Sequence, residues 1–299
     1  MLKKCFKMIL GTFMAFSMVA CSSQPEKEAV SILCPSGAPA LAMLGAGLVE
    51  NVTIDYANTD VLQAELSKED GEYDIIVAPL NLGAKMYENN PVYQLESVLT
   101  WGNLYVVGVE GTDLNNASIA SFGEKAVPQL IFNYCFDSSN MNITYYSDVS
   151  QASQALLTKQ ADCALLAMPV AAATIAKGKE NDINLTILFD LQQEFKIKSG
   201  MEQSGYPQAS LFVKKESQKK VSYVLDEVKD FIDQGDEDAI GKAIDEAGVE
   251  TLGVPSKEIC VKTWDKQNIR YEKAKDVKED IENFLNLFHI EIQDDFIIV

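Results

Sequence analysis

Two short turns carry the residues best suited to contact a small molecule. Residues 32–44 read ILCPSGAPALAML and residues 119–131 read IASFGEKAVPQLI. Each segment combines an apolar strand, a Ser/Gly turn and a proline near a helix start, a position that proline favours. A helix start leaves N–H groups unpaired at the positive end of its dipole, and glycine or alanine lets a ligand approach them. The pattern predicts backbone-mediated binding of a solute; the alternative is that Gly37 and Gly123 only serve tight turns.

Side chains for covalent or acid–base catalysis are scarce. His289 is the one histidine of the chain, which removes His-based triads and most zinc sites. The sequence contains no GxSxG elbow, no GxGxxG and no phosphate-binding loop with lysine. The acidic run at residues 230–238 lacks the calcium-loop spacing. The sequence therefore predicts no catalytic residue, no metal and no cofactor.

The arginine count bears on the chemistry of the solute. Arg270 is the only arginine, and it lies outside both turns. Because solutes with a carboxylate are commonly held by a bidentate guanidinium, the sequence disfavours amino acids as ligands. A small anion held by backbone amides and a neutral or cationic aromatic heterocycle against Trp101 both stay open. Trp101 can equally be a core residue at a strand end, and Tyr206 faces the same choice.

The elements that must position the turns are short apolar strands alternating with longer helix-period segments. This alternation indicates βαβ units and parallel sheets. The order occurs twice, since YDIIVAPLNLGAKMY at 73–87 lines up with ADCALLAMPVAAATI at 161–175, about 88 residues later, as do the two turns. We expect two similar halves whose loops meet at a cleft at the carboxyl ends of their strands. The expected strands are residues 29–34, 52–56, 74–79, 118–122, 143–146, 163–166 and 185–189.

The C-terminal third predicts a return strand followed by surface helices. A strand-like segment, YPQASLFVKK, occupies residues 206–215, and charged helix-period segments occupy residues 217–234, 237–247 and 276–288. In the last of these, apolar residues recur at helical spacing while charged residues fill the other face. This helix should cover a domain, with its charges in solvent.

The first residues have the layout of a secretory signal. Three lysines precede an apolar run at residues 8–20, and Cys21 follows it. The run is shorter than the about 20 residues that cross a bilayer. The residues around Cys21 resemble the lipobox of bacterial lipoproteins, which implies a signal peptide at 1–20, a lipid on the Cys21 thiol and a polar tether at 21–28. Ordinary secretory cleavage nearby is the alternative.

Composition bounds the partners and the redox chemistry. The formal net charge is −19, and removal of the signal would make the chain more acidic. An acidic surface is repelled by phosphate backbones and anionic headgroups, which excludes nucleic acid and leaves membrane attachment to the lipid. A hydrophobic fraction of 47% over 299 residues supports two domains with real cores. Cys34, Cys135, Cys163 and Cys260 fit neither a CxxC pair nor a zinc pattern, so we interpret them as buried thiols.

Taken together, four motifs resemble the solute-binding lipoproteins of nitrate, sulfonate and taurine-type ABC transporters, a group that includes binders of thiamine precursors. The motifs are PSGAPALA (35–42), DIIVAPLNLGAKMY (74–87), LTWGNLYVVG (99–108) and ADCALLAMPVAAA (161–173). The resemblance implies a class II periplasmic-binding-protein fold, an α/β fold of two domains with a ligand cleft between them. It implies one domain at 29–110 plus 206–299 and an inserted domain at 111–205, with crossings near 108–112 and 205–208.

The resemblance also transfers the positions of the ligand-binding loops, but not the specificity. Carried over position by position, the implied ligand-binding residues are Ser36, Gly37, Ala38, Ala78, Pro79, Leu80, Asn81, Trp101, Gly102, Asn103, Ser121, Phe122, Gly123, Ala167 and Met168.

The implied function is that of an extracytoplasmic receptor, monomeric and anchored by its lipid to a bacterial cell membrane. It would capture a small solute by hinge closure and deliver it to the permease and ATPase subunits of an ABC importer. The solute class stays open between nitrate, sulfonate or taurine and pyrimidines or thiamine precursors. The alternative is an exported ligand-sensing lipoprotein or an enzyme on the same fold.

Overall fold

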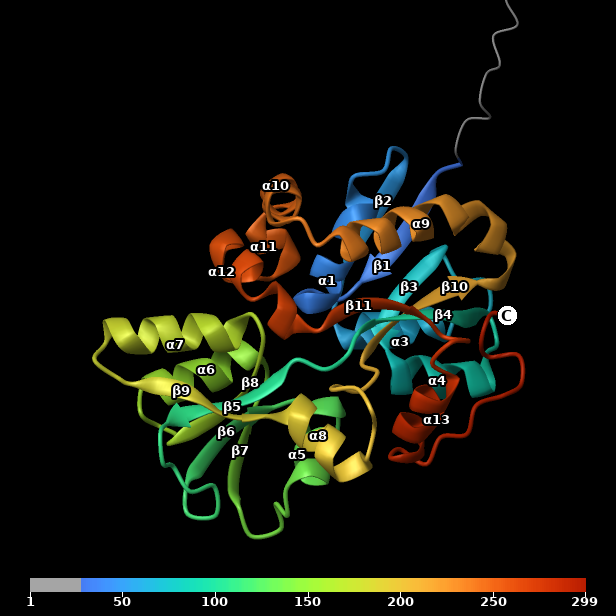
Figure 1. The fold of residues 1–299 in the computed structure, drawn as a ribbon. Coiled ribbons are helices and arrows are strands. Elements are labelled where there is room, and N and C mark those ends of the chain that lie inside the picture. The colour runs from blue at the N-terminus through green and yellow to red at the C-terminus, as the bar shows by residue number, and fades with distance from the viewer. Residues whose placement is uncertain (1–27) are drawn as a thin grey trace, which may run out of the picture.

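The computed structural model describes residues 28–299, which form two α/β lobes, each built on its own sheet (Figure 1). The predicted signal peptide, Cys21 and all but the last residue of the predicted tether lie outside the described residues. The first lobe contains β1 (Val30–Cys34), β2 (Val52–Tyr56), β3 (Ile75–Pro79), β4 (Tyr93–Thr100), β10 (Ala209–Lys214) and β11 (Ile269–Lys273). The second lobe contains β5 (Leu104–Val109), β6 (Ser118–Phe122), β7 (Asn142–Tyr146), β8 (Cys163–Ala167) and β9 (Leu185–Asp190).

The two sheets repeat one topology. Their strand orders are β11-β4-β10-β3-β1-β2 and β7-β6-β8-β5-β9. In each, the first strand pairs in parallel with the second and third, as β1 does with β2 and β3, and β6 with β7 and β8. A strand that has just crossed from the other lobe lies antiparallel beside the third, β10 beside β3 and β5 beside β8. The duplicated βαβ prediction is confirmed, and each of the seven expected strands agrees with the structure within one residue at either end.

The first crossing between the lobes lies earlier than the sequence predicts. The stretch around Gly102 is apolar almost throughout, so its pattern gives no break, and we expected the crossing near residues 108–112. In the structure β5 pairs on both sides with strands of the second lobe, β8 and β9. The crossing therefore runs through Trp101, Gly102 and Asn103, and the first-lobe range 29–110 ends too late by the length of β5. The return crossing runs through the loop at residues 200–208.

Helices cover the faces of both sheets (Figure 1). Those of the first lobe before the crossing are α1 (Ala38–Ala42), α2 (Leu44–Gly47), α3 (Thr59–Leu66) and α4 (Leu80–Asn89). The second lobe has α5 (Val127–Cys135), α6 (Val149–Leu157), α7 (Val170–Glu180) and α8 (Leu191–Ser199). After the return come η1 (Lys215–Ser217), α9 (Gln218–Gln234), α10 (Glu237–Ala247), α11 (Val249–Leu252), α12 (Lys257–Lys262), η2 (Trp264–Gln267) and α13 (Lys278–Asn286).

The C-terminal helices complete the first lobe. The apolar stripe of α9 is buried beside α2, and α10 packs on α2 and α12. In α13, Ile281, Phe284 and Leu285 are buried, as the sequence pattern predicts for a helix that covers a core. Within residues 28–299, no helix is both long enough and apolar enough to cross a membrane.

Aromatic rings join the two lobes beneath the crossings. Tyr206, in the return crossing, is fully buried, and its ring centroid lies 5.1 Å from that of Phe195 in α8. On its other side Tyr206 stacks on Phe284 of α13, with the centroids 5.9 Å apart. Rings at such distances pack favourably beyond the area that they bury. These contacts favour the interpretation of Tyr206 as a core residue over its interpretation as a ligand contact.

All four cysteines of the described region are free thiols. Cys34, Cys163 and Cys260 are buried, as predicted, whereas Cys135 is only half-buried. Burial raises the pKa of the Cys163 and Cys260 thiols to about 12, so both are protonated and unreactive near neutral pH.

Candidate functional site

A cavity of about 380 Å³ lies between the lobes. Most of its wall comes from segments that follow the carboxyl ends of parallel strands in both sheets, where open α/β folds bind ligands. The rest comes from the two crossings, the start of β10 and the loop after α11. The volume of the cavity falls in the range of small-molecule sites. The lining residues are Pro35, Ser36, Gly37, Ala38, Pro39, Thr59, Pro79, Asn103, Phe122, Val149, Ala167, Met168, Pro169, Val170, Gln208, Ala209 and Gly253.

The first-lobe turn lines the cavity. The prediction that its amides are free does not hold for the Gly37 amide. Ser36, Gly37 and Ala38 all lie in the wall. The Gly37 N–H donates to the carbonyl of Leu252, at 2.8 Å, so it is not available to a solute. Gly37 has a φ of 90°, a conformation that glycine adopts without strain, so the turn interpretation of this residue holds alongside its place in the wall.

The second-lobe turn contributes differently, although its sequence repeats the first. Phe122 lines the cavity, whereas Ser121 is buried in the lobe and Gly123 is outside the wall. Gly123 has a φ of 67°, and a β-carbon on it would come 2.7 Å from the ring of Pro128. The glycine is therefore explained by the turn alone, and the wall of the second lobe is built mainly at the end of β8, by Ala167 and the residues after it.

Several predicted site residues lie in the core instead of the cavity. Ala78 and Leu80 are fully buried on either side of Pro79, which does line the cavity. The remaining residues outside the wall are Asn81, which is half-buried, and Trp101 and Gly102, which are buried.

The guanidinium group of Arg270, the one arginine of the chain, packs over the ring of Trp101. The Trp101 side chain is 3% exposed, and the Arg270 guanidinium carbon lies 4.8 Å from the centre of its rings. A cation over an aromatic face is attracted by the ring quadrupole. Burial lowers the pKa of Arg270. The structure thus places Trp101 as a core residue under the crossing and not as an aromatic wall for a solute.

The sequence reasoning missed about half of the cavity wall. Pro169 and Val170 directly follow a predicted loop, and their signal was the same helix-start proline. Gln208 lies in the expected return crossing, but nothing in the pattern aimed its side chain inward. Thr59 begins α3 and Gly253 follows α11, and neither segment carries a repeated motif, so only the fold brings them to the cavity.

Asn103 fixes the end of β8 to the first crossing. Its backbone carbonyl accepts from the Met168 N–H at 2.9 Å, and its side-chain Nδ2 donates to the Met168 carbonyl at 3.0 Å. The side-chain Oδ1 has no partner although it is shielded from solvent. The same holds for Oε1 of Gln208, on the return crossing. Two unpaired acceptors thus belong to residues of the cavity wall.

The two crossings lie side by side and are hydrogen-bonded to each other. The Tyr206 N–H donates to the Trp101 carbonyl at 3.2 Å, and the Gln208 N–H donates to the Thr100 carbonyl at 3.0 Å. A pair of adjacent connections of this kind lets two lobes rotate about one line.

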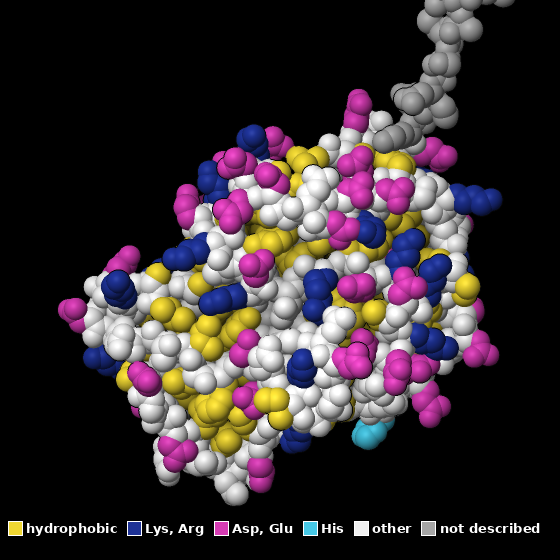
Figure 2. Space-filling model, viewed as in Figure 1, with side chains coloured by type: hydrophobic (Ala, Val, Ile, Leu, Met, Phe, Trp, Pro, Cys, Tyr) yellow, Lys and Arg dark blue, Asp and Glu magenta, His cyan; other side chains and the backbone are white. Residues whose placement is uncertain are grey.

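None of the groups that line the cavity is ionisable. Within residues 28–299 no group of three or more His, Cys, Asp and Glu side chains is arranged to hold a metal ion. His289 is exposed in the loop after α13, and it is the cyan side chain in Figure 2. Acidic side chains are spread over the outer surface of both lobes in that view. The charge of the chain therefore lies around the cavity wall and not in it.

Comparison with known proteins agrees with this architecture. No protein-family model matches the chain, and no curated protein matches it in sequence. Among solved structures, an ABC transporter protein from Parabacteroides distasonis superposes with a TM-score of 0.74 at 18% identity, over 91% of this chain and 99% of its own. The ligand-binding component of an ABC-type import system from Staphylococcus aureus, solved with zinc, has a TM-score of 0.65 at 12% identity, over 91% and 96% of the chains.

A third similar structure is the alkanesulfonate-binding protein SsuA from Xanthomonas axonopodis pv. citri, bound to MOPS. It superposes with a TM-score of 0.58 at 12% identity, over 89% of this chain and 94% of its own. Each similarity extends over nearly the whole described chain. The predicted periplasmic-binding-protein fold, two α/β lobes around a cleft, is therefore confirmed.

Proposed function

We propose that this protein is the solute-binding receptor of an ABC importer, held outside the cytoplasm by a lipid on Cys21. It captures a small solute between its lobes, closes by rotation about the paired crossings, and presents the closed form to a permease. The observation that carries the proposal is the cavity to which both lobes contribute, at the carboxyl ends of the strands that follow the duplicated pattern.

The chemistry of the wall supports binding over catalysis. Its polar side chains are two hydroxyls and two carboxamides, from Ser36, Thr59, Asn103 and Gln208. A serine or threonine hydroxyl is a weak nucleophile without an adjacent base, and the wall offers no base. The similar structures that are named as transport components support the transport role of this fold here.

A blocked-cavity variant tests the proposal. Ser36 is exposed and lines the cavity, so Ser36→Trp should fill the space without disturbing the core. We expect at least one compound from a library of nitrate, sulfonates, pyrimidines and flavins to raise the melting temperature of the wild type, because a ligand of the native state stabilises it. The shift should vanish in Ser36→Trp and persist in Ser222→Trp, a matched change on the exposed side of α9. A shift that survives in Ser36→Trp would place binding elsewhere and refute the proposal.

The anchor is tested separately from the cavity. Replacing Cys21 with serine removes the only thiol at the predicted lipidation position. We expect Cys21→Ser to appear in the soluble fraction of fractionated cells, while the wild type sediments with membranes. Equal sedimentation of the two proteins would rule out the lipid anchor but leave the binding role standing.

A further inference from the structure

The cavity wall holds no charge to balance a charged solute. Its only polar side chains are the hydroxyls and carboxamides of Ser36, Thr59, Asn103 and Gln208. An ion that enters such a space loses water contacts and gains no opposite charge, which is costly. The wall is thus poorly suited to bind nitrate, a sulfonate or a free ammonium group.

The helix starts at the cavity supply only part of the missing positive charge, because an N–H group at several of them is already bonded. In α3 the side chain of Asn58 accepts from Val61 N, and in α6 the carboxylate of Asp148 accepts from Gln151 N. The Asp148 carboxylate also places negative charge at that helix start.

At two further helix starts an N–H group is bonded or missing. The first N–H of α4, on Leu80, donates to the Gln208 carbonyl at 2.8 Å. In the five-residue α1, Pro39 has no N–H, and the amide of Gly37 is bound to Leu252. The start of α7, at Val170, lines the cavity and has no side-chain cap. The solute can therefore place an acceptor there, but one helix start is a weak partner for a full negative charge.

Two side-chain oxygens in residues of the wall have no hydrogen-bond donor. Asn103 is 5% exposed, and its Nδ2 is committed to the Met168 carbonyl. Because a carbonyl only accepts, this bond fixes which end of the carboxamide is the oxygen. Its Oδ1, like Oε1 of Gln208, is left without a donor. A buried acceptor without a partner is destabilising, and both side chains belong to the cavity wall, so turning either carboxamide oxygen toward the N–H group of a solute would relieve it.

The rest of the wall is apolar and includes one aromatic ring. Phe122 and Met168 face the cavity together with Val149, Val170 and several alanines and prolines. Such a surface favours a compact apolar or planar body over a heavily hydroxylated one.

We propose that the cavity takes an uncharged, compact ring solute that has N–H donors for Asn103 and Gln208 and a carbonyl acceptor for the start of α7. This inference rests on the proposed receptor function and narrows its solute class. It excludes the small anions that the fold also accommodates in other proteins, and it makes the two crossing segments part of the recognition surface.

A panel of matched probes tests the solute class. Uracil, hydantoin and 2-pyrrolidone carry N–H donors without charge, and 1,3-dimethyluracil lacks the donors. Nitrate, methanesulfonate and taurine supply the charged arm. We expect calorimetry and thermal shift to detect at least one uncharged N–H compound, at least about tenfold weaker binding of its N-methylated form, and no anion. Binding should change little between low and high salt, since no ion pair forms.

Two changes at Gln208 test the donor requirement. Gln208→Leu removes the unpaired acceptor and breaks no side-chain bond within the described protein, so we expect about tenfold weaker binding with an unchanged melting temperature of the free protein. Gln208→Glu keeps an acceptor and adds negative charge, so the uncharged solute should still bind. Gln63→Leu, an exposed change on α3, is the matched control and should bind as the wild type does.

The outcomes separate this inference from the receptor function. An anion that stabilises the wild type but not Ser36→Trp overturns the solute class and leaves the receptor role intact. Failure of every uncharged N–H probe also overturns the class, while the library screen with Ser36→Trp decides the receptor role independently. Unchanged affinity in Gln208→Leu removes this residue from recognition and contradicts the inference.

Discussion

Each lobe has a hydrogen-bonded serine–aspartate pair at the start of its sheet, which we call its bracket. The two brackets differ only in what surrounds them. In the first lobe the Asp74 carboxylate accepts from the Ser31 amide at 2.9 Å and from its hydroxyl at 3.2 Å. In the second the Asp162 carboxylate accepts from the Ser118 amide at 2.8 Å and from its hydroxyl at 2.7 Å. Each bracket ties the start of the first strand to the start of the third strand of its sheet.

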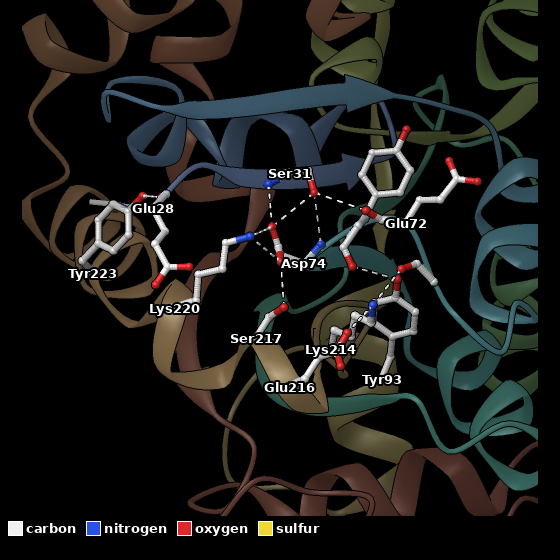
Figure 3. A network of polar contacts seen from close by, with 12 residues as sticks. Glu28, Ser31, Glu72, Asp74, Tyr93, Lys214, Glu216, Ser217, Lys220 and Tyr223 are labelled. Atoms are coloured by element: carbon white, nitrogen blue, oxygen red, sulfur yellow. Dashed lines mark hydrogen bonds and ion pairs between the residues drawn. The ribbon is translucent and has the colours of Figure 1, made fainter. Parts of the chain in front are cut away.

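Only the first bracket has recruited the C-terminal part of the chain (Figure 3). Asp74 also accepts from Ser217, at 2.6 Å, and from the Lys220 ammonium of α9, at 2.8 and 2.9 Å. Asp74 is buried, whereas Asp162 is exposed and has no lysine partner among the described residues. The same local motif therefore connects distant segments of the chain in the first lobe, whereas in the second lobe it connects only two neighbouring strands.

This difference predicts that the two lobes differ in rigidity. The first lobe is fastened by the helices that return to it, so it should act as the rigid platform. The second lobe depends on its own strands and on the two crossings. Regions with fewer fixed long-range contacts open at lower free energy, so exchange of amide hydrogens should be faster in the second lobe.

The largest effect is expected from removing the carboxylate of the first bracket. Asp74→Ala leaves Lys220, whose side chain is only 27% exposed, without its partner and orphans the Ser31 amide. We expect a loss of about 3 kcal/mol in the free energy of unfolding, because breaking a largely buried ion pair exposes an uncompensated charge. Urea denaturation measures it.

Two controls sharpen this prediction. Adding Lys220→Met to Asp74→Ala removes the stranded charge, so the double variant should recover part of the loss. Burial acts to raise the pKa of Asp74, but hydrogen bonds from Lys220, Ser217 and Ser31 outweigh it, so the pKa lies below its usual value. Its stabilising contribution is therefore present above the ordinary carboxyl range and is lost as the pH falls through the lowered pKa. A gap between wild type and variant that stays constant into acid would contradict this account.

The matched change in the second lobe should be much milder. Asp162→Ala removes an exposed carboxylate that accepts only from Ser118. We expect a cost of about 0.5 kcal/mol in the same denaturation experiment, because solvent replaces most of what is lost. If Asp162→Ala costs as much as Asp74→Ala, the two brackets are equivalent and the platform interpretation is wrong.

The repeated pattern of the sequence explains why the fold could be predicted so fully. Alternating apolar strands with turn residues fixed the early strands of each sheet, and amphipathic spacing found α9, α10 and α13. The strands β4, β5 and β11 were not expected as such. β5 was assigned to the wrong lobe, because a continuous apolar stretch does not reveal where the chain leaves one sheet for another.

The cavity was harder to predict, for a physical reason. Residues in loops that belong to the repeated motifs, such as Ser36 and Met168, could be predicted because a short stretch of sequence encodes the turn. Trp101 was misleading, because a buried ring under Arg270 and a ring facing a ligand look alike in sequence. Gln208 and Gly253 reach the cavity through contacts between distant segments, which no local pattern encodes.

Small-angle scattering tests the central claim most directly, because the claim is that one space between the lobes both binds and closes. With a compound that raises the melting temperature, the wild-type radius of gyration should decrease, and Ser36→Trp should show no change under the same conditions. An identical radius with and without a bound compound in the wild type would contradict closure about the paired crossings, and with it the proposed receptor mechanism.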